Sequence, residues 1–399
     1  MPEPILITGA GIVSAIGLNK AETLDSLINE RTGICQLKYL KTEHTDYPVG
    51  EVKLSDSEMG MILGLDNDIP SPRTFLMGAL AMKEALEESR LLNEEKHNVA
   101  LVSGTTVGGM DKSEQYYLDY LDNDSKNAYI RTHDCGACTD MIANYFGIFN
   151  FVTTVSTACS SAANAIISGA NLIRSGQREI VVVGGSECIT KFHLNGFNSL
   201  MILDHEQCRP FDKTRKGINL GEGAAYLVLE SETSAKRRGV NILGELLGFG
   251  NACDAYHQTA SSPDGYGAYF AMEKALVKAG LRPQDIQYIN AHGTGTPDND
   301  ASESCALKRL FSDYMPAVSS TKSFTGHTTS ASGSIETTIC LLALNNQFLP
   351  VNLNWKNQME DGITPVVDSK PTTEIKNVMC NAFGFGGNDS SLVLSKYVE

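Results

Sequence analysis

Three short segments carry side chains that could together make and break a thioester, and the first supplies a nucleophile. Cys159 stands among small residues, after a strand-like run that ends at Val155 and before an alanine-rich stretch typical of a helix over residues 160–175. A cysteine at a helix N-terminus lies near unpaired backbone N–H groups and the positive end of the helix dipole. Both favour the thiolate, which is the nucleophilic form. The pattern predicts a reactive thiol at Cys159; the alternative is a buried, inert cysteine.

The other two segments supply imidazoles and a cation. His292 ends a strand-like run and is followed by Thr294 and Thr296, whose hydroxyls could hydrogen-bond an amide-bearing substrate arm. Lys322 and His327 stand five residues apart around a glycine, at the entry to a helix of small residues. Taken singly, these side chains could be a solvated lysine and capped histidines with structural roles only. Together with the cysteine they predict a charged, nucleophilic site.

One nucleophile, two neutral imidazoles and one fixed cation suit carbon–carbon bond formation on a thioester. The cysteine would take an acyl group from a first thioester. Two imidazole N–H donors could then stabilise the enolate oxygen that forms when a malonyl-type thioester loses CO2. This chemistry needs neither a metal nor an organic cofactor.

The elements that must position these residues alternate between strands and helices. Near-continuous apolar runs followed by glycine or a polar residue predict strands that are buried on both faces, with helices covering the sheet. Apolar stripes predict helices between them, the last of which would open at the acidic residue Asp300. The pattern predicts an α/β fold with strands near residues 5–8, 99–102, 180–183, 286–289 and 378–382 and helices over 73–90, 160–175, 266–279 and 300–311.

No low-complexity linker divides the chain, but its most polar break lies at residues 231–238. We therefore predict two halves, residues 1–235 with the cysteine and residues 236–399 with both histidines and the lysine. A weak internal echo supports this division: a strand followed by Gly-Thr-Thr from residue 104 resembles a strand followed by Gly-Thr-Gly-Thr from residue 293.

Composition and charge exclude several classes of protein. The 399 residues carry 32 Lys and Arg against 47 Asp and Glu, a net charge of −15, which argues against a nucleic-acid binder or a binder of anionic membranes. Apolar runs are strand-sized, and the sequence MPEPILITGAG has no cationic region typical of a secretory signal. Ten scattered cysteines do not form a disulfide framework. We therefore expect a cytoplasmic protein with mostly reduced thiols, on which a local basic patch remains possible.

Three further motifs have simpler explanations. The run from Gly9 to Ser14 lacks the third glycine of a dinucleotide fingerprint, so we interpret it as a tight turn. The S-x-x-K motif that ends at Lys322 lacks the partner motifs of penicillin-recognising enzymes. Cys135 and Cys138 form a lone C-x-x-C without a second ligand pair, which favours helix packing over a zinc or redox role.

The segments around Cys159, His292 and Lys322 resemble the β-ketoacyl-acyl carrier protein synthases, most closely the type II elongating enzymes of fatty acid and polyketide synthesis. The resemblance covers essentially the whole chain, because further motifs occur in the same order. These are Gly221-Glu222-Gly223-Ala224, Asp254-Ala255-Tyr256-His257 and Asn381-Ala382-Phe383-Gly384-Phe385-Gly386-Gly387. The resemblance implies a thiolase fold, in which two similar α/β halves form five layers, α-β-α-β-α, usually as a homodimer.

The resemblance also implies roles for the residues of the site. Cys159 would be the acylated nucleophile, and His292 and His327 the pair for decarboxylation and condensation. Lys322 would lie near His327 and fix its hydrogen bonding. Behind these groups the resemblance implies supporting carboxylates at Glu336 and Asp300.

Substrate contacts are implied in the same way. The backbone N–H groups of Cys159 and Phe385 would form an oxyanion hole, and Phe385 matches a mobile gate over the cysteine. Three threonines match positions that hold the phosphopantetheine arm, with Phe383 beside them, and two apolar residues match acyl-pocket positions. The threonines are Thr294, Thr296 and Thr259, and the acyl-pocket residues are Val107 and Phe197.

The sequence departs from the family pattern at four places. After His327, relatives usually carry Leu-Leu-Gly-Ala-Ala-Gly, where this chain has a Thr-Thr-Ser-Ala-Ser-Gly run. After the glycine gate they carry Thr-Asn, where this chain has Asn388 and Asp389, and Ala162 replaces a usual glycine. The approach to Arg73 is acidic and proline-rich instead of basic. The chemistry is unaffected, but acyl preference and carrier docking stay open; a polar lining suits a polyketide or polyene chain.

The resemblance implies acyl carrier protein as partner and, since the substrates carry phosphopantetheine, no cofactor on the enzyme. The carrier is itself acidic, so a local basic patch must steer the encounter. Two other functions are kept as alternatives: a thiolase-fold acyltransferase that uses CoA thioesters, and a non-catalytic chain-length subunit. The retained cysteine and histidine pair speaks against both, although a heterodimer with such a subunit remains an alternative to a homodimer. Candidate docking residues are Arg209, Lys213, Arg215, Lys216, Lys191 and Arg73.

Overall fold

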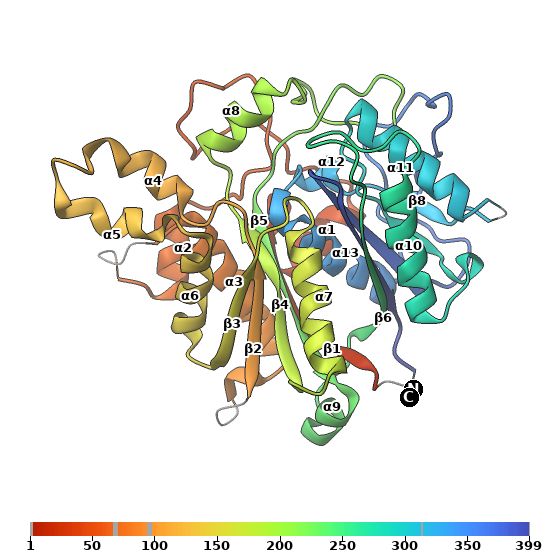
Figure 1. Cartoon of the computed structure of the whole chain (residues 1–399), viewed down its shortest axis with the longest axis horizontal. Helices are drawn as coiled ribbons and strands as arrows, with labels where there is room; N and C mark the ends of the chain where they lie inside the picture. Colours follow the sequence, from red (N-terminus) through yellow and green to blue (C-terminus); the bar gives the residue numbers. More distant parts are fainter. Residues whose placement is uncertain (1–2, 67–70, 94–97, 313, 399) are drawn as a thin grey trace.

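Ten strands in the described part of the chain form one continuous mixed sheet (Figure 1). The computed structural model describes residues 3–66, 71–93, 98–312 and 314–398. Along the sheet the strand order is β3-β2-β4-β5-β1-β6-β10-β9-β7-β8. The strands are β1 (Ile5–Ser14), β2 (Val99–Gly104), β3 (Phe149–Val155), β4 (Ile180–Glu187), β5 (Gly223–Ser231), β6 (Gly244–Cys253), β7 (Tyr288–Asn290), β8 (Ala317–Ser319), β9 (Asn377–Gly384) and β10 (Asn388–Ser395).

The sheet consists of two half-sheets with the same topology. Numbered within its own half, each has the strand order 3-2-4-5-1, and the two halves meet where β1 pairs with β6. In both, the second strand is parallel to its two neighbours, whereas the fifth is antiparallel to the first and the fourth. The predicted α/β fold with two similar halves is therefore confirmed.

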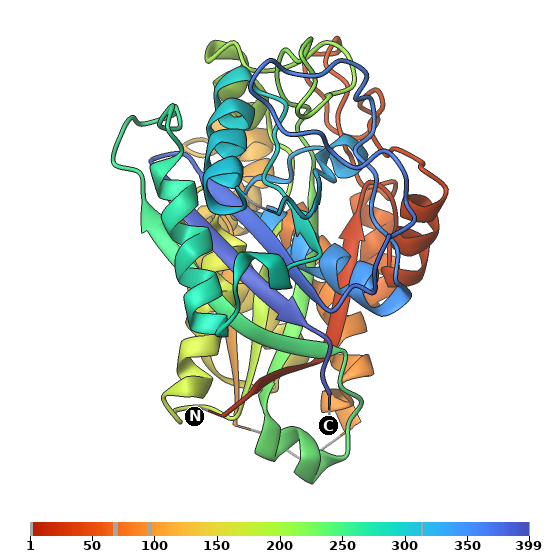
Figure 2. The ribbon, with the colours of Figure 1, turned by 90° about the vertical axis from the view of Figure 1, so that its right-hand side faces the viewer.

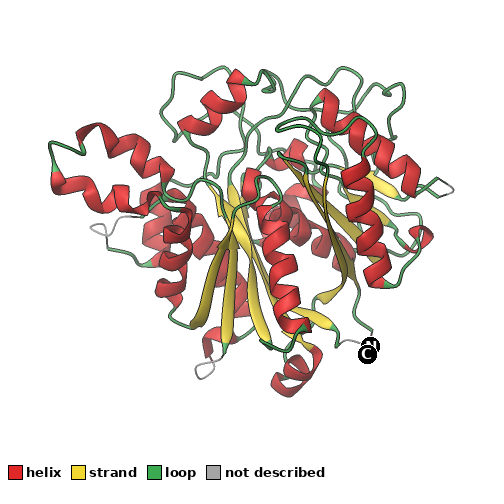
Figure 3. Ribbon diagram, in the orientation of Figure 1, coloured by secondary structure: helices red, strands yellow, loops and turns green. Residues whose placement is uncertain are grey.

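Helices cover both half-sheets and fill the space between them (Figures 2 and 3). The helices α3 and α6 pack on the outer face of the first half-sheet, and α10 and α11 cover the second. Between the half-sheets, α7 and α13 pack against each other, which completes five layers. The helices are α1 (Lys20–Ile28), α2 (Asp56–Leu63), α3 (Arg73–Glu88), α4 (Met110–Tyr116), α5 (Asn127–Ile130), α6 (Cys135–Phe146), α7 (Ser161–Arg174), α8 (Lys191–Ser199), α9 (Glu232–Arg238), α10 (Tyr266–Ala279), α11 (Pro297–Leu310), α12 (Lys322–Thr325) and α13 (Ser332–Asn346).

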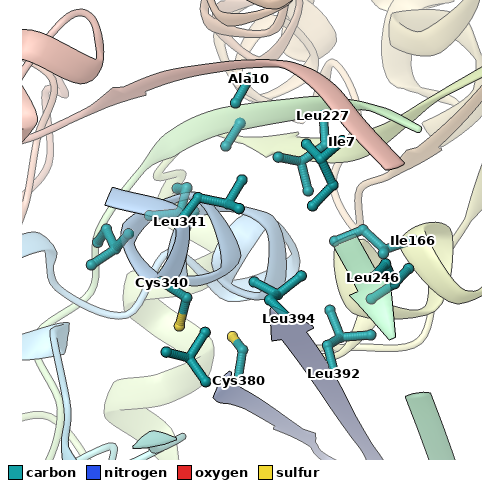
Figure 4. Packing of buried hydrophobic residues seen from close by; sticks show 14 of the residues in the cluster. Ile7, Ala10, Ile166, Leu227, Leu246, Cys340, Leu341, Cys380, Leu392 and Leu394 are labelled. Carbon is teal, nitrogen blue, oxygen red and sulfur yellow. The ribbon is translucent and has the colours of Figure 1, made fainter. Parts of the chain in front are cut away.

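The core converges on the central helix α13. Every residue of α13 from Ser332 to Leu344 is buried, so this helix has no solvent-facing side. Figure 4 shows side chains of β1 and β5 on one side of α13 and of β9 and β10 on the other. A helix buried all round must carry small or apolar residues, which explains the run of Ser, Gly, Thr and Ile at its start. The core thereby fixes both half-sheets relative to the start of α13.

The predicted helices lie close to the observed ones. The helix predicted over residues 266–279 has these bounds. The helix at 73–90 begins as predicted and ends two residues early, and the helix at 160–175 is one residue shorter at each end. The start predicted at Asp300 is wrong, because α11 begins at Pro297, whose fixed φ and missing N–H suit the first helical position. The polar break at residues 231–238 is no linker: most of it forms the short helix α9.

Two expectations concern the whole chain. No helix in the described ranges is both long and apolar enough to span a lipid bilayer. All ten cysteines lie in the described part, and each is a free thiol. Residues 67–70 of the approach to α3, which include Asp68, lie outside the described residues.

Candidate active site

Cys159 lies in the sharp connection between β3 and α7. Ala158 adopts a left-handed backbone with φ of 51°, which turns the chain so that Cys159 directly precedes the helix cap Ser160. The turn is held by Ser161, whose hydroxyl accepts a hydrogen bond from Thr157 N at 2.9 Å and donates one to Ala158 O at 2.6 Å. The strand and helix therefore present the thiol at a defined point.

The predicted thiolate at Cys159 is wrong for the resting site. Burial raises the pKa of the Cys159 thiol to about 11, although the charge of Lys322 and the backbone N–H groups of Phe385 and Cys159 act in the opposite direction. The sequence pattern shows the helix N-terminus but not how completely the thiol is removed from water, and removal from water destabilises the thiolate. At neutral pH the resting cysteine is a neutral thiol that needs a base.

That base is within reach in the second half of the chain. His327 Nε2 lies 3.1 Å from Cys159 Sγ, a hydrogen-bond distance for a sulfur partner. The His327 backbone is fixed on both sides, because its N–H donates to Asn219 O at 2.7 Å and its carbonyl accepts from Gly221 N at 2.9 Å. The ring of His292 stands edge-on to that of His327, with centroids 5.2 Å apart. One thiol and two imidazoles therefore meet at one point.

Both imidazoles are neutral, as the sequence predicts. Burial lowers the pKa of His292 and of His327 well below the ordinary value, and the charge of Lys322 lowers both further. Neither Nδ1 atom has a hydrogen-bond partner in the described part of the chain. A neutral imidazole can accept a proton at one nitrogen and donate one at the other, which is what a general acid–base group requires.

Lys322 forms a buried ion pair with Glu336. Glu336 lies on the central helix α13, and both side chains are almost completely buried. The expectation that Lys322 fixes the hydrogen bonding of His327 is not met, because its ammonium contacts the Glu336 carboxylate and no hydrogen bond joins it to His327 in the described structure. Lys322 acts on the thiol and the imidazoles through its charge instead.

A buried glutamate that the sequence reasoning missed holds His292. Glu303 on α11 accepts the backbone N–H of His292 at 2.9 Å and of Gly293 at 2.7 Å, and also the side-chain N–H of Asn381 at 3.2 Å. Burial raises the pKa of Glu303 to about 7. One signal was present in the sequence: Glu303 stands on the inward face of a helix predicted to be amphipathic. That signal was not specific, because the same helix carries other acidic residues and the sequence does not show which of them is buried.

Asp300 holds the next part of the same loop. Its carboxylate accepts from Gly295 N at 3.1 Å and from Phe211 N at 2.7 Å, and Arg215 Nε lies 3.6 Å away. Gly295 connects Thr294 and Thr296, whose hydroxyls are hydrogen-bonded to each other at 2.9 Å. Asp300 therefore supports the two threonines from behind.

A cavity of about 280 Å³ leads to the thiol. It brings together most of the side chains predicted for the site, whereas Val107 does not line it. Val107 is instead buried in an apolar cluster of the first half, so its predicted acyl-pocket position is separate from this cavity. The predicted residues that line the cavity are Cys159, His292, His327, Thr294, Thr296, Thr259, Phe383, Phe385 and Phe197.

A glycine loop closes one side of the cavity. The loop comprises residues 384–387 between β9 and β10, and Phe385 within it directs its N–H at Cys159 Sγ. A Cβ at Gly384 would lie 3.0 Å from Thr157 O and 3.2 Å from the backbone nitrogen of Cys159, tighter than ordinary contact, so the loop approaches the Cys159 turn closely. The ring of Phe385 stacks on Phe197 with centroids 5.8 Å apart. The loop therefore covers the thiol and supplies one N–H donor to it.

The six candidate docking residues separate into two groups. Arg73 is buried in ion pairs with Glu222 and Asp56, so its prediction as a docking residue is wrong. Arg209 is paired with Asp204 and Glu206, and Arg215 is mostly buried against Asp300. The lysines are exposed, and one of them lines the cavity that contains Cys159. These exposed residues are Lys191, Lys213 and Lys216, of which Lys216 lines the cavity.

Both cysteines of the lone C-x-x-C motif lie on the helix α6. Cys135 opens α6, and Cys138 is buried one turn later against the core. No group of three or more His, Cys, Asp or Glu side chains in the described part could hold a metal ion. The motif is a packing feature of α6.

Family models match both halves of the chain. The β-ketoacyl synthase N-terminal domain matches residues 2–235, and the β-ketoacyl synthase C-terminal domain matches residues 243–356. A 3-oxoacyl-[acyl-carrier-protein] synthase 2 of Coxiella burnetii is 32% identical over 99% of both chains, and that of Staphylococcus aureus is 30% identical over 98% of both.

Solved structures give the same answer. The ishigamide ketosynthase/chain length factor superposes with a TM-score of 0.91, at 30% identity and over 100% of both chains. A ketosynthase from Xenorhabdus doucetiae, in complex with its chain length factor, gives a TM-score of 0.85 at 30% identity over 99% of this chain and 98% of that one. Matches of this extent cover the cysteine and both histidines. The chain therefore belongs to the β-ketoacyl synthase family.

Proposed function

We propose that this protein is an elongating β-ketoacyl-[acyl carrier protein] synthase that condenses an acyl group held on Cys159 with malonyl-[acyl carrier protein]. The observation that carries the proposal is the meeting of three groups at the base of one cavity. Cys159 Sγ lies 3.1 Å from His327 Nε2, and the ring of His292 lies 5.2 Å from that of His327. A nucleophile beside two neutral imidazoles is the set that decarboxylative condensation requires.

In the first half-reaction, His327 activates the neutral thiol. As Cys159 Sγ forms a bond to the acyl carbon, Nε2 of His327 takes the thiol proton, since the thiol pKa of about 11 leaves almost no thiolate at neutral pH. The backbone N–H groups of Cys159 and Phe385 stabilise the oxyanion. The bond to the carrier sulfur then breaks, and the carrier leaves as a thiol with the proton that His327 held.

In the second half-reaction, His292 and His327 stabilise an enolate. The bond between the malonyl carboxylate and the α-carbon breaks, CO2 leaves, and the ring N–H groups donate to the enolate oxygen. The α-carbon then attacks the acyl carbon of acyl-Cys159, a carbon–carbon bond forms and the carbon–sulfur bond breaks. Lys322 keeps both imidazoles neutral through its charge. Cys159 leaves the acyl carbon as a thiolate and takes up one proton from solvent water, which balances the negative charge of the malonyl carboxylate that departs as neutral CO2.

The cavity suits a phosphopantetheine arm. Thr294 and Thr296 at its wall, with Thr259 on the opposite loop, offer hydroxyls to the amide groups of the arm. The arm is part of the substrates and not a cofactor of the enzyme. The catalytic groups in the proposed steps are therefore all residues of this chain. Phe385 separates the arm from the thiol and acts as the gate for acyl transfer.

The test is a condensation assay with carrier-bound substrates. Acyl-carrier protein and malonyl-carrier protein should give β-ketoacyl-carrier protein and one CO2 per turnover, followed by mass spectrometry. Free malonyl-CoA should react much more slowly. Equal rates with malonyl-CoA would favour a CoA-dependent acyltransferase, and no product with Cys159 unlabelled by iodoacetamide would favour a non-catalytic chain-length subunit.

The carrier protein docks, in our proposal, at the three exposed lysines Lys191, Lys213 and Lys216, of which Lys216 lines the cavity. Acidic partners approach fastest where local charge is positive, and the rest of this chain is strongly acidic. Reversing Lys191, Lys213 and Lys216 to Glu should raise KM for the carrier substrate and leave transfer from a small acyl thioester intact. The matched control reverses Lys236 and Arg237 on α9, at the opposite end of the molecule from α8 (Figure 1). Equal loss with both substrates would refute this docking site.

A second subunit pairs, in our proposal, along the free edge of β3. This strand ends the sheet and is partly exposed, and an unpaired edge strand is a template for another chain. Exposed apolar side chains lie on the segment between α4 and α5, where Leu118 and Leu121 are 92% and 91% exposed. We propose a homodimer, which light scattering should detect and Leu118→Lys with Leu121→Lys should weaken. A monomer that dimerises only with a co-expressed chain-length subunit would favour the heterodimer.

We further propose that this enzyme works in the cytoplasm. Its ten cysteines form no disulfide in the described structure, which suits a reducing compartment. Fractionation of cells with an antibody against the native protein would test this location.

A further inference from the structure

An acidic residue next to the glycine loop has no use in the mechanism above. Asp389 is the second residue of β10, two residues after the glycine loop ends. Its side chain is buried, with 6% of the residue exposed, and it lines the cavity that contains Cys159. A buried carboxyl in the wall of a catalytic cavity calls for a partner, since desolvation without compensation is costly.

Asp389 has no partner in the described structure, in contrast to its neighbour Asp254. Asp254 accepts the backbone N–H of Ser262 at 2.6 Å and of Gly267 at 3.1 Å. No hydrogen bond and no ion pair is formed by the carboxyl of Asp389 in the described ranges. The two side chains are close: a Cβ placed on Gly267 would lie 2.2 Å from Asp389 Oδ2 and 3.0 Å from Asp254 Cβ.

Two backbone hydrogen bonds connect this acidic pair to the gate. The N–H of Asp254 donates to Gly387 O at 2.7 Å, and Gly386 N donates to Gln258 O at 2.8 Å. Gly386 and Gly387 have φ of 83° and 73°, conformations that glycine adopts without strain. The glycine loop is therefore fastened to the segment that follows β6 directly beside the two carboxyl groups.

The two charged groups that act on the pKa of Asp389 are acidic, although the cation Lys216 also lines the cavity. Asp254 approaches from the end of β6 and Glu303 from α11, and both raise the pKa of Asp389 in addition to the effect of burial. The segment of α10 against it contributes only the glycine backbone, and its neighbour across β9 is Phe383. Burial, the largest cause, raises the pKa of Asp389 to about 8.

We propose that Asp389 is a positioning residue, which must carry a proton for the glycine loop to close over Cys159. Closing takes up one proton from water onto the Asp389 carboxylate, and opening releases it. The proposal rests on the proposed function, because it assigns Asp389 to the gate of that reaction. Through the gate, the approach of substrate to the thiol becomes dependent on pH.

The direction of the pH effect follows from the two states of the loop. In the open state that we propose, Asp389 is exposed to water and its carboxyl has the ordinary pKa of 3.8, whereas in the closed state burial raises that pKa to about 8. Between these values the open state is ionised and the closed state is not, so each pH unit favours opening by up to about tenfold. Above about pH 8 both states are ionised, and the preference stops changing.

Alkylation of Cys159 by iodoacetamide between pH 6 and 9.5 tests the proposal. The matched variant is Asp389→Asn, which has the same shape and cannot ionise. Taking the ratio of wild-type to variant rates removes the ionisation of Cys159 itself. The ratio should rise with pH by up to about tenfold per unit and level off above about pH 8. A ratio that is constant across this range would overturn the proposal.

A second measurement does not depend on the reactivity of Cys159. In protein with carbon-13 in its aspartate carboxyl groups, the resonance missing from Asp389→Asn should titrate with a midpoint near pH 8. A midpoint near pH 4 would overturn the proposal. Failure of the proposed function is detected separately, as absence of acyl transfer from carrier protein to Cys159.

Discussion

The connection from β3 to α7 and the connection from β8 to α13 occupy equivalent places in the two halves, yet they carry different chemistry. The first is a tight turn with Cys159, and the second holds Lys322 and His327 around α12. Since α7 and α13 pack against each other in the central layer, both connections end at one point. A duplicated fold thus supplies two helix starts side by side, one for the nucleophile and the other for the base and the cation.

The loops after β2 and β7 show the same division. Each is held by a buried glutamate: Glu187 accepts Thr105 Oγ1 at 2.5 Å and Thr106 N at 2.9 Å, and Glu303 accepts the N–H groups of His292 and Gly293. Only the second loop carries an imidazole. The first half therefore holds its loop without an imidazole, whereas the equivalent loop of the second half carries the histidine for which we propose a catalytic role.

The largest effect is expected from removal of the proposed nucleophile, which only the first of the two connections carries. Cys159→Ala should reduce condensation by at least about 1,000-fold, since no other group replaces a covalent nucleophile. Intact-mass analysis after incubation with acyl-carrier protein should show no acyl adduct. An adduct on a different residue would place the nucleophile elsewhere.

Substitution of Lys322 tests whether the connection from β8 to α13 influences the two histidines through the charge of this lysine. Lys322→Met leaves Glu336 buried without a partner, which should reduce the free energy of unfolding by about 3–5 kcal/mol in chemical denaturation. Because the Lys322 charge lowers the pKa of both histidines, the acid limb of the rate profile should move to higher pH.

A double variant separates these two effects. Lys322→Met with Glu336→Leu removes both charges and should recover most of the lost stability. Its acid limb should stay at the higher pH. If it returned to the wild-type position, the charge of Lys322 would not be the cause.

Substitution of the two buried glutamates should affect the loops after β2 and β7 differently. Glu303→Gln should lower kcat by about tenfold, because it loosens the loop that orients His292. Glu187→Gln should instead reduce the free energy of unfolding by about 1–3 kcal/mol, with kcat within about threefold of wild type. Equal losses of kcat in both variants would show that the first loop also serves the chemistry.

The smallest effect is expected at the turn before the cysteine. Ala158 has a left-handed backbone, which costs about 1 kcal/mol for a residue with a Cβ. Ala158→Gly removes that strain but adds a similar entropy to the unfolded chain, so the free energy of unfolding should change by less than about 1 kcal/mol. A larger loss in chemical denaturation would mean that the Ala158 methyl group packs tightly.

Sequence patterns predicted much of this molecule, because its buried strands and helices have clear apolar periodicity. The helix over residues 266–279 was accessible in this way. The meeting of Cys159 with His292 and His327 was expected instead from the residue types of the three motifs and from the family resemblance. The start of α11 was predicted at Asp300 because acidic residues are typical of a first helical turn. The helix in fact begins at Pro297, and Asp298 and Asp300 both lie in its first turn. The protonation of Cys159, the burial of Arg73 and the role of Glu303 depend on solvent exclusion by distant segments, which local patterns do not report.

The central claim is that the Cys159 thiol accepts the acyl group and that the two histidines stabilise the enolate that attacks it to form a new carbon–carbon bond. The most direct measurement is intact-mass analysis of the enzyme in two stages. Acyl-carrier protein alone should add one acyl mass at Cys159, and malonyl-carrier protein should then remove it with formation of an equal amount of β-ketoacyl-carrier protein. An acyl-Cys159 that persists after malonyl-carrier protein is added, or an acyl group on any other residue, would contradict the account.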